Sequence, residues 1–507
     1  MLFFKKNNEN NGKSLIKKDA SNGFSEDIEI NLERISQLFK DDDFLVVRRF
    51  STGGLCPVKC AVLLIQSMTD DYIVSQFLMN GAIGEKINTG DDPIDAIFSK
   101  SLFGSNIKIV SDFDDAVNDL LSGSAILLCD GSAKAVSADT KGYESRGITE
   151  PENEKLLRGP KECFVEKLVT NVSLIKRRII NADFKCKMTV LGRRTKTKVA
   201  VCWLEGIADK KIVDEVFLRL QKIDIDGIIA SNYVEELIRD EKYSPFGTVG
   251  STERPDVTAA RILEGRVAII VNGSPSVLTV PYLFVENFQS ADDYYSNFLY
   301  SNIGRALRFV SFFLTLTIPA LVVSFITFQK QMLPTIFTLS IISDREGVPF
   351  PAIVECLGLL LIFEMLRETA LRMPSGISQT LSIVGGIVIG ESAISAKIIS
   401  ATMVISIGIT ILTGLMLPRL RGAIIYYRLL FLLCSTVIGL YGYLFAFCIL
   451  MINLSSLKSF GVKYTSSFFK VRYQQLKDIL IRAPWTEMIE RPDELTDNVV
   501  RQKGQHE

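Results

Sequence analysis

The stretch FVSFFLTLTIPALVVSFITF, residues Phe309–Phe328, holds twenty consecutive residues without one charged side chain. A helix of about twenty apolar residues is long enough to cross the hydrocarbon core of a bilayer, which is ~30 Å thick. Arg305 and Arg308 come just before it and suit the polar edge of a first span. The stretch therefore predicts a helical membrane region, and not a soluble enzyme, in the second half of the chain.

Two further apolar segments, Ile398–Pro418 and Leu429–Leu457, are also long enough to cross a bilayer. Two segments that carry charge precede them, Phe350–Arg372 and the short, glycine-rich Ile377–Ala396. The candidate functional residues in or beside these two segments are Glu355, Glu364, Arg367, Glu368, Glu391 and Lys397. We predict an all-α transmembrane domain over residues 300–452 with four to five crossings, in which residues 377–396 form a possible re-entrant segment.

These charges need a polar environment, because a carboxylate at membrane depth is costly unless it faces protein, water or an opposite charge. Glu364 comes three residues before Arg367 and four before Glu368, so the three side chains are neighbours on a helix. Two interpretations stay open: an internal ion pair or interfacial helix end, and a polar face that lines a water-filled pore or a subunit interface. Glu391 follows a glycine-rich stretch, which favours a broken helix whose backbone lines a cavity.

The side of the membrane on which the C-terminus lies depends on the number of crossings. Residues 453–507 form a basic tail, which the positive-inside rule places in the cytosol if there are four crossings. Five crossings would place this tail outside. The N-terminal sequence contains no apolar core of a secretory signal, so we expect a cytosolic head.

The residues before the first span predict an α/β head. Short apolar runs alternate with amphipathic stretches and with Asp-Gly or Asn-Gly turns. LSGSAILLCDGSAKAV (Leu121–Val136) aligns with LEGRVAIIVNGSPSVL (Leu263–Leu278) at a constant offset of 142 residues, which indicates duplication. We expect a flexible segment over residues 1–40, a first α/β module over 41–140, a connector over 141–190 and a second α/β module over 191–295.

Helix caps are predicted at several turns of the head. Ser111 or Asp112 is expected to cap a helix that runs to Leu121, and Asp209 a helix that runs to Leu220. The sequence TERPD places Thr252 as a cap before Pro255, with Asp256 in the first turn. We expect Glu253 and Arg254 of this sequence to form an interdomain salt bridge.

Several classes of function are excluded by composition. The 57 basic residues balance 57 acidic ones, which argues against a nucleic-acid partner. The sole histidine is His506, so histidine-based catalysis and metal sites are not expected, and no phosphate-binding glycine motif is present. Cys56 and Cys60 lack a second ligand pair for zinc, and their role is unexplained. We expect no enzyme activity and no cofactor.

An ordered series of segments carries a resemblance to a known family. The segments are RGPKECFVEKLVTNVSLIKRR (Arg158–Arg178), RRTKTKVAV (Arg193–Val201), IDIDGI (Ile223–Ile228), STERPD (Ser251–Asp256), EGRVAIIVNGSP (Glu264–Pro275), REGVPFPAIVE (Arg345–Glu355), EMLRETALRMP (Glu364–Pro374) and SIVGGIVIGESAISAKIIS (Ser382–Ser400). Over residues 150–450 the chain resembles the A subunit of the GerA-type nutrient germinant receptors of endospore-forming bacteria. It departs from the family pattern at Asn272, where members usually carry Asp, and at Gly247, where they carry Pro.

The resemblance implies a receptor subunit in the spore inner membrane, with a permease-like B subunit and a lipoprotein C subunit as partners. It also implies a homo-oligomer, in contact with membrane lipid, that forms the ion-conducting part of the receptor. The carboxylates of the helical half would then line the path of a ligand-gated channel. A secondary transporter and a membrane-anchored scaffold without conduction remain the alternatives, although no internal repeat relates Phe309–Arg372 to Ile377–Leu457.

Overall fold

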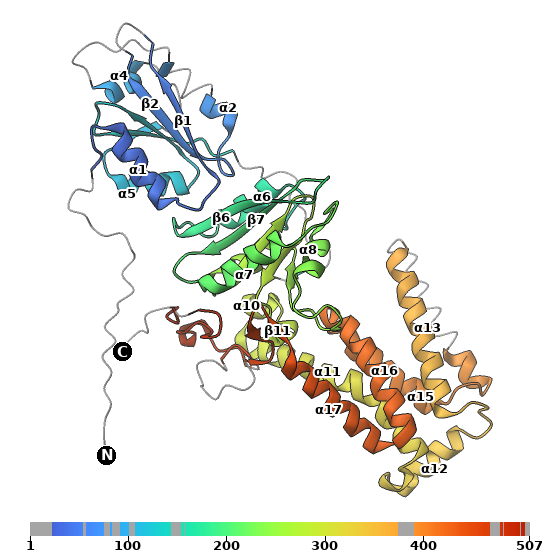
Figure 1. Cartoon of the computed structure of the whole chain (residues 1–507). Coiled ribbons are helices and arrows are strands. Elements are labelled where there is room, and N and C mark those ends of the chain that lie inside the picture. Colours follow the sequence, from blue (N-terminus) through green and yellow to red (C-terminus); the bar gives the residue numbers. More distant parts are fainter. Residues whose placement is uncertain are drawn as a thin grey trace, which may run out of the picture.

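A computed structural model describes eleven ranges of the chain: residues 23–53, 57–75, 82–83, 92–100, 107–142, 154–156, 158–373, 390–466, 477–479, 481–496 and 498–501. Two α/β modules follow one another and lead into a bundle of long helices (Figure 1). We refer to the two modules as the head and to the residues after the last long helix as the tail. The predicted fold class, an α/β head followed by a helical half, is confirmed.

The first module is a five-stranded antiparallel sheet with the strand order β1-β2-β4-β5-β3. Its strands are β1 (Leu45–Ser51), β2 (Lys59–Ile65), β3 (Ile107–Val110), β4 (Ala125–Cys129) and β5 (Ala135–Ala138). Its helices are α1 (Ile28–Leu38), α2 (Asp71–Ile73), α4 (Pro93–Lys100) and α5 (Phe113–Leu121). Alternate residues of β2 point to opposite faces, so that one face packs on α1 and α5 and the other packs on α4.

The second module repeats this plan with the order β6-β7-β9-β10-β8. Its strands are β6 (Phe184–Leu191), β7 (Thr197–Leu204), β8 (Gly250–Thr252), β9 (Val267–Val271) and β10 (Val277–Val280). Its helices are α6 (Leu168–Lys176), α7 (Lys210–Gln221), α8 (Ser231–Ile238) and α9 (Pro255–Leu263). The bounds of α5, β4 and β5 differ from those of α9, β9 and β10 by the predicted 142 residues, which agrees with duplication.

The predicted caps hold at two of three places. Asp112 accepts a hydrogen bond from the N–H of Asp114 at the start of α5, and Asp209 accepts one from Lys211 at the start of α7. The prediction for Thr252 is wrong, since the residue before α9 is Arg254 and Thr252 ends strand β8. The hydroxyl of Thr252 still accepts a hydrogen bond from the N–H of Arg254, at 3.2 Å.

Equivalent turns of the two modules bind equivalent helices. In the first, Asp130 Oδ1 accepts from the N–H of Ile28 at the start of α1, at 3.3 Å. In the second, Asn272 Oδ1 accepts from the N–H of Leu168 at the start of α6, at 3.1 Å. Asn272 therefore accepts a hydrogen bond at a helix N-terminus, where a carboxylate would add a favourable charge.

Replacing Asn272 with Asp is expected to stabilise the head by about 0.5 kcal/mol, because the helix dipole favours an anion at this end. Asn272→Leu should instead cost about 1 kcal/mol, since the acceptor is lost. Guanidinium unfolding followed by the fluorescence of Trp203, which is buried in β7, measures both changes. Equal stability of the two variants would contradict the capping role.

The two modules are joined through a buried ion pair. Lys176 at the end of α6 reaches Asp42, with 2.6 Å between Nζ and Oδ2, and both side chains are almost fully buried. Lys176 also lies over the rings of Phe44 and Phe184, one from each side of the junction. All of α6, and β6 except for its last residue Leu191, fall within residues 141–190, the predicted connector, so this range contributes directly to the second module.

The helical region begins after η2 (Phe284–Phe288) and α10 (Asp292–Tyr295). Its long helices are α11 (Phe298–Thr327), α13 (Ala352–Arg372), α15 (Ala401–Leu415), α16 (Arg421–Ile438) and α17 (Leu440–Ser456). Shorter elements are η3 (Lys330–Met332), α12 (Thr335–Asp344) and η4 (Pro418–Leu420). Two segments, Phe298–Thr327 and Pro418–Ile438, are long and apolar enough to cross a membrane.

The predicted span Leu429–Leu457 is wrong as a single helix. The chain reverses at Gly439, whose φ of +65° lies in the region that glycine adopts without strain, and α17 packs back along α16 (Figure 1). Ile398–Pro418 also shortens to the fifteen residues of α15. Most of the predicted re-entrant segment 377–396 lies outside the described residues, of which 390–395 are helical.

The tail returns to the head through β11 (Lys458–Ser459), β12 (Val462–Lys463) and η6 (Trp485–Glu487). The hydroxyl of Ser459 donates to the carbonyl of Thr248, and the N–H of Phe460 donates to Asp240, both in the second module. The start of α11 and the end of α17 therefore lie on the same side of the helical region.

Candidate functional site

Glu355 is the most deeply buried of the predicted membrane carboxylates. Its Oε2 accepts hydrogen bonds from the N–H and the hydroxyl of Ser400, at 3.1 and 2.8 Å, and its Oε1 lies 2.9 Å from Arg345. These contacts connect the end of α12, the first turn of α13 and the start of α15. Because both oxygens are engaged inside the protein, Glu355 acts as a structural link between three helices.

Glu364 lies further along α13 and forms two ion pairs. Arg367, one turn on, contacts Oε2, and Arg428 of α16 lies 3.0 Å from Oε1. Arg421 lines the same small cavity as Arg367 and Arg428. An acid on α13 is thus neutralised by basic residues from its own helix and from α16, which matches the internal ion pair among the predicted interpretations.

The other three predicted membrane residues are exposed. Glu368 pairs with Arg372 at 2.7 Å on the surface of α13. Lys397 donates to the carbonyl of Glu346 at 3.3 Å. Glu391 is exposed, and within the described part of the chain no hydrogen bond or ion pair is assigned to it. The six predicted residues therefore do not converge on one point within a single chain.

The sequence Thr252–Asp256 clamps the connector onto the second module. Arg254 is 1% exposed and donates to the carbonyl of Pro160 and to Asp256 Oδ2, both at 2.8 Å. Asp256 also accepts from the hydroxyl of Tyr295 at 2.5 Å, and burial together with this hydrogen bond raises the pKa of Tyr295 to about 12. The ion pair of Arg254 is therefore formed with Asp256, inside the segment Thr252–Asp256. Tyr295 of α10 contacts the same carboxylate.

Glu154 was missed by the sequence analysis and connects this sequence to the helical region. Its Oε2 accepts from the hydroxyl of Thr252 at 2.6 Å and from the N–H of Glu253 at 3.3 Å. Its Oε1 lies 2.6 Å from Arg419 in η4, just before α16. No periodicity signals such a residue, because the two partners lie about 100 and 265 positions away.

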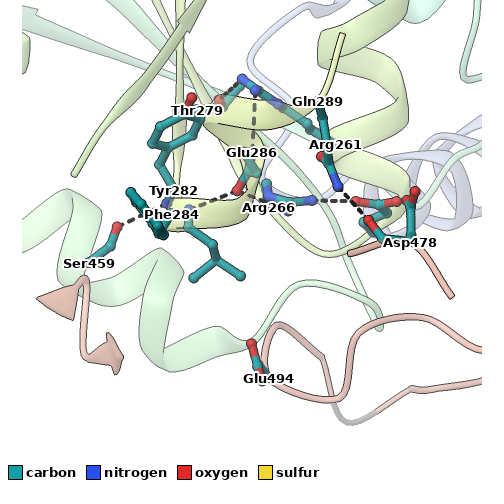
Figure 2. Close-up of polar contacts among 12 residues, drawn as sticks. Arg261, Arg266, Thr279, Tyr282, Phe284, Glu286, Gln289, Ser459, Asp478 and Glu494 are labelled. Carbon is teal, nitrogen blue, oxygen red and sulfur yellow. Dashed lines mark hydrogen bonds and ion pairs between the residues drawn. The ribbon is translucent and has the colours of Figure 1, made fainter. Parts of the chain in front are cut away.

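A buried polar network occupies the junction between head and helices (Figure 2). Glu286 in η2 lies 3.2 Å from Arg261 and 3.1 Å from Arg266, and it accepts from the N–H of Leu283. Arg261 also donates to the hydroxyl of Thr279 at 2.6 Å. The network ties β10 and α9 of the second module to the segment that enters α11.

The same network extends to the tail through Glu264 and Asp478. Glu264 pairs with Arg266 and with Arg501, the latter at 2.5 Å. Burial disfavours the carboxylate of Glu264, but the charges of these two arginines outweigh it and hold its pKa below the usual value. Asp478 accepts from Arg305 and from the hydroxyl of Tyr294, at 3.0 and 2.8 Å.

Among the described residues, no group of three or more His, Cys, Asp or Glu side chains is placed to hold a metal ion. Cys56 lies outside the described residues. Cys60 lies opposite Cys129 on the neighbouring strand, with 2.9 Å between the sulfur atoms.

Comparison with known proteins gives a consistent result. The family model of the Bacillus/Clostridium GerA spore germination protein matches residues 21–494. Spore germination protein KA of Bacillus subtilis (strain 168) is 38% identical over 461 residues, which cover 90% of this chain and 85% of that protein. Spore germination protein B1 of the same strain is 35% identical, over 92% of this chain and 96% of that protein.

Two other proteins are also similar to this chain. The uncharacterized membrane protein YfkQ of Bacillus subtilis (strain 168) is 36% identical over 92% of this chain and 91% of its own length. The crystal structure of the N-terminal domain of the A subunit of the Bacillus megaterium spore germinant receptor GerK3 is 30% identical, covers 52% of this chain and 97% of that domain, and has a TM-score of 0.42. With the family model matched over most of its length, this chain belongs to the GerA family of spore germination proteins.

Proposed function

We propose that this chain is the A subunit of a nutrient germinant receptor, which initiates spore germination from the spore inner membrane. The relatives named above, spore germination proteins that match nearly the whole chain, support this proposal. A permease-like B subunit and a lipoprotein C subunit are its proposed partners. The chain's own proposed task is to form an oligomeric, ion-conducting path in the membrane.

The proposed orientation has the head and the tail together in the cytosol. The tail contacts the second module through Phe460 and Arg501, so both ends of the helical region face the same side. This arrangement supports an even number of crossings, and of the predicted four to five it is four that places the basic tail in the cytosol. Phe298–Thr327 would form the first crossing.

The exposed position of Glu391 is the observation that supports the proposed conduction. It is exposed at the edge of an apolar helical region, and no partner is assigned to it among the described residues. A carboxylate that faces lipid costs several kcal/mol, so in a membrane this side chain needs water or another subunit. Glu355 and Glu364, in contrast, are neutralised by arginines within the chain and support the walls of the path.

Helix α13 supports the homo-oligomer. Its C-terminal end rises apart from α11, α16 and α17 in Figure 1, and the helix exposes Leu361, Met365 and Leu371 beside the Glu368–Arg372 pair. A surface with apolar side chains and a charged pair suits contact with a second copy better than contact with lipid alone. Copies arranged in a ring would bring Glu391 of each chain toward a common axis.

Purified full-length chain in liposomes of uncharged lipid is expected to conduct cations. Glu391→Gln should lower the permeability ratio of potassium over chloride by about threefold or more, because a ring of carboxylates selects cations. Reversal potentials in a potassium chloride gradient measure the ratio. Glu33→Gln, on the exposed side of α1, removes one charge from the head and should leave the ratio unchanged.

Currents with unchanged selectivity in Glu391→Gln would remove this residue from the path. Uptake that depends on a substrate gradient, with no channel current, would favour the secondary transporter. A chain that forms oligomers but conducts nothing, and whose Glu391→Gln variant still supports germination, would favour the scaffold.

A further inference from the structure

A cavity of about 630 Å³ lies where the head, the helical region and the tail meet. One wall is α9 with the following Glu264 and Arg266, and a second wall is the segment from Glu286 to Tyr295 that leads into α11. The tail contributes a third wall with Trp485, Arg491 and Arg501. None of the residues named for the proposed conduction path lines this cavity.

The walls of this junction cavity carry more positive than negative charge. Five arginines line it, against three carboxylates. The charged lining residues are Asp256, Arg261, Glu264, Arg266, Glu286, Arg419, Arg491 and Arg501. Ion-pair partners outside the lining, Arg254 for Asp256 and Glu154 for Arg419, add one charge of each sign and leave the excess at two. An excess of positive charge in a partly buried site favours the binding of an anion.

Arg491 is the clearest uncompensated charge. It donates to the carbonyls of Leu263, Asn498 and Val500, and no carboxylate pairs with it among the described residues. Burial and the nearby Arg501 lower the pKa of Arg491, which is the direction that an additional anion would reverse. Acidic residues of the tail such as Glu490 line an adjoining, smaller cavity of about 70 Å³, which shares Arg266, Arg491 and Arg501 with the junction cavity.

Arg266 gives a second, independent sign of a ligand. The residue is 5% exposed and its terminal nitrogens are paired with Glu264 and Glu286. Its Nε is buried and has no hydrogen-bond partner among the described residues. Figure 2 shows Arg266 between Glu286 and Asp478, close to Arg261. A guanidinium with a free N–H in a buried site can donate to one more acceptor oxygen.

Most of the uncharged lining residues are aromatic or aliphatic, and two of them, Gln289 and Ser290, are polar. Tyr294, Tyr295 and Trp485 contribute rings, and Val257 and Ala260 contribute small apolar surfaces from α9. A volume of this size holds a small organic molecule, and such sites combine apolar walls with a few polar groups that fix orientation. The cavity therefore suits a molecule with one anionic end and one apolar end.

We propose that the junction cavity binds an organic phosphate. A phosphate monoester carries a charge of about −1.5 to −2 at neutral pH and three acceptor oxygens, which matches an excess of two guanidinium charges. Arginine forms paired hydrogen bonds to phosphate more readily than lysine does. The phosphate can belong to a soluble molecule or to an anionic lipid, because Arg419 places the cavity next to the head-side end of α16.

Binding at this site would attach the tail to the head and to the start of α16. Arg491 and Arg501 come from the tail, Arg261 from α9 and Arg419 from the start of α16, so one anion would connect three parts of the chain. This inference goes beyond the proposed conduction and does not depend on it.

Trp485 provides the readout, because the chain contains only two tryptophans and the other, Trp203, can be replaced by Phe. In an uncharged maltoside detergent, phenyl phosphate is expected to change the emission of Trp485 in the full-length Trp203→Phe chain and to saturate, while phenol does not. The lipid arm compares nanodiscs of phosphatidylcholine with nanodiscs that also contain phosphatidic acid. A response in the first arm identifies a soluble phosphate, and a response in the second identifies a lipid.

Arg491→Gln is the decisive variant, because it removes a charge without leaving a carboxylate unpaired. It should weaken binding about tenfold or more, as expected when a charge-assisted hydrogen bond is lost. Arg194→Gln, whose side chain is 84% exposed, is the matched control and should bind normally. Absence of a saturable response in both arms, equal affinity of the two variants, or equally tight binding of benzoate would overturn the proposal.

Discussion

Replacing Arg254 with alanine is expected to destabilise the head by roughly 3–5 kcal/mol, since the removal of one partner from a buried ion pair leaves the other charge uncompensated. Arg254 is almost fully buried, and its guanidinium contacts Asp256 and the carbonyl of Pro160. The variant would lose the clamp on the connector and, among the described residues, leave Asp256 with the hydroxyl of Tyr295 as its donor. Guanidinium unfolding of the full chain, followed by Trp203 fluorescence, measures the loss.

A matched control separates burial from charge. Arg194→Ala removes an exposed guanidinium that lies 3.8 Å from Asp226, and it should change stability by about 0.5 kcal/mol or less. The double variant Arg254→Ala with Asp256→Ala should recover about 1 kcal/mol or more of the loss, because no buried carboxylate is then left unpaired. If Arg254→Ala costs no more than Arg194→Ala, the clamp is not a stabilising contact.

Replacing Gly442 with alanine is expected to separate α16 from α17, at a cost of roughly 3 kcal/mol. A Cβ atom at Gly442 would overlap the carbonyl oxygen of Cys434 and lie 2.5 Å from the carbonyl carbon. Both are backbone atoms, so no side chain can move aside and the two helices must shift. Unfolding in mixed micelles with increasing dodecyl sulfate, followed by circular dichroism, measures the effect.

Gly408→Ala in α15 is the control for this prediction. A Cβ atom there meets nothing within 4 Å, so alanine should stabilise the helix by about 0.5–1 kcal/mol through its better helix propensity. The two substitutions add the same methyl group to two helices of the same region and are expected to act in opposite directions. A stable Gly442→Ala chain would mean that α16 and α17 are further apart than in this structure.

The features that neighbouring residues specify were predictable. The apolar run Phe309–Phe328 lies within α11, and the offset of 142 residues relates α5, β4 and β5 to α9, β9 and β10. Asp112 and Asp209 cap helices as expected, because a capping hydrogen bond spans only two residues. The reversal at Gly439 was missed, since a glycine inside an apolar run does not reveal whether the chain continues or turns.

The candidate site depended on contacts between distant positions. The charge spacing on α13 indicated the pair of Glu364 and Arg367. The second partner, Arg428, is 64 residues away from Glu364 in the sequence and reaches it only through the packing of α16 against α13. Glu154 and the arginines of the junction cavity carry no local signal at all. Hydrophobic periodicity and caps arise from residues a few positions apart and can be read along the chain. Ion pairs and cavities depend on distances in space, which only the packing of modules, helices and tail establishes.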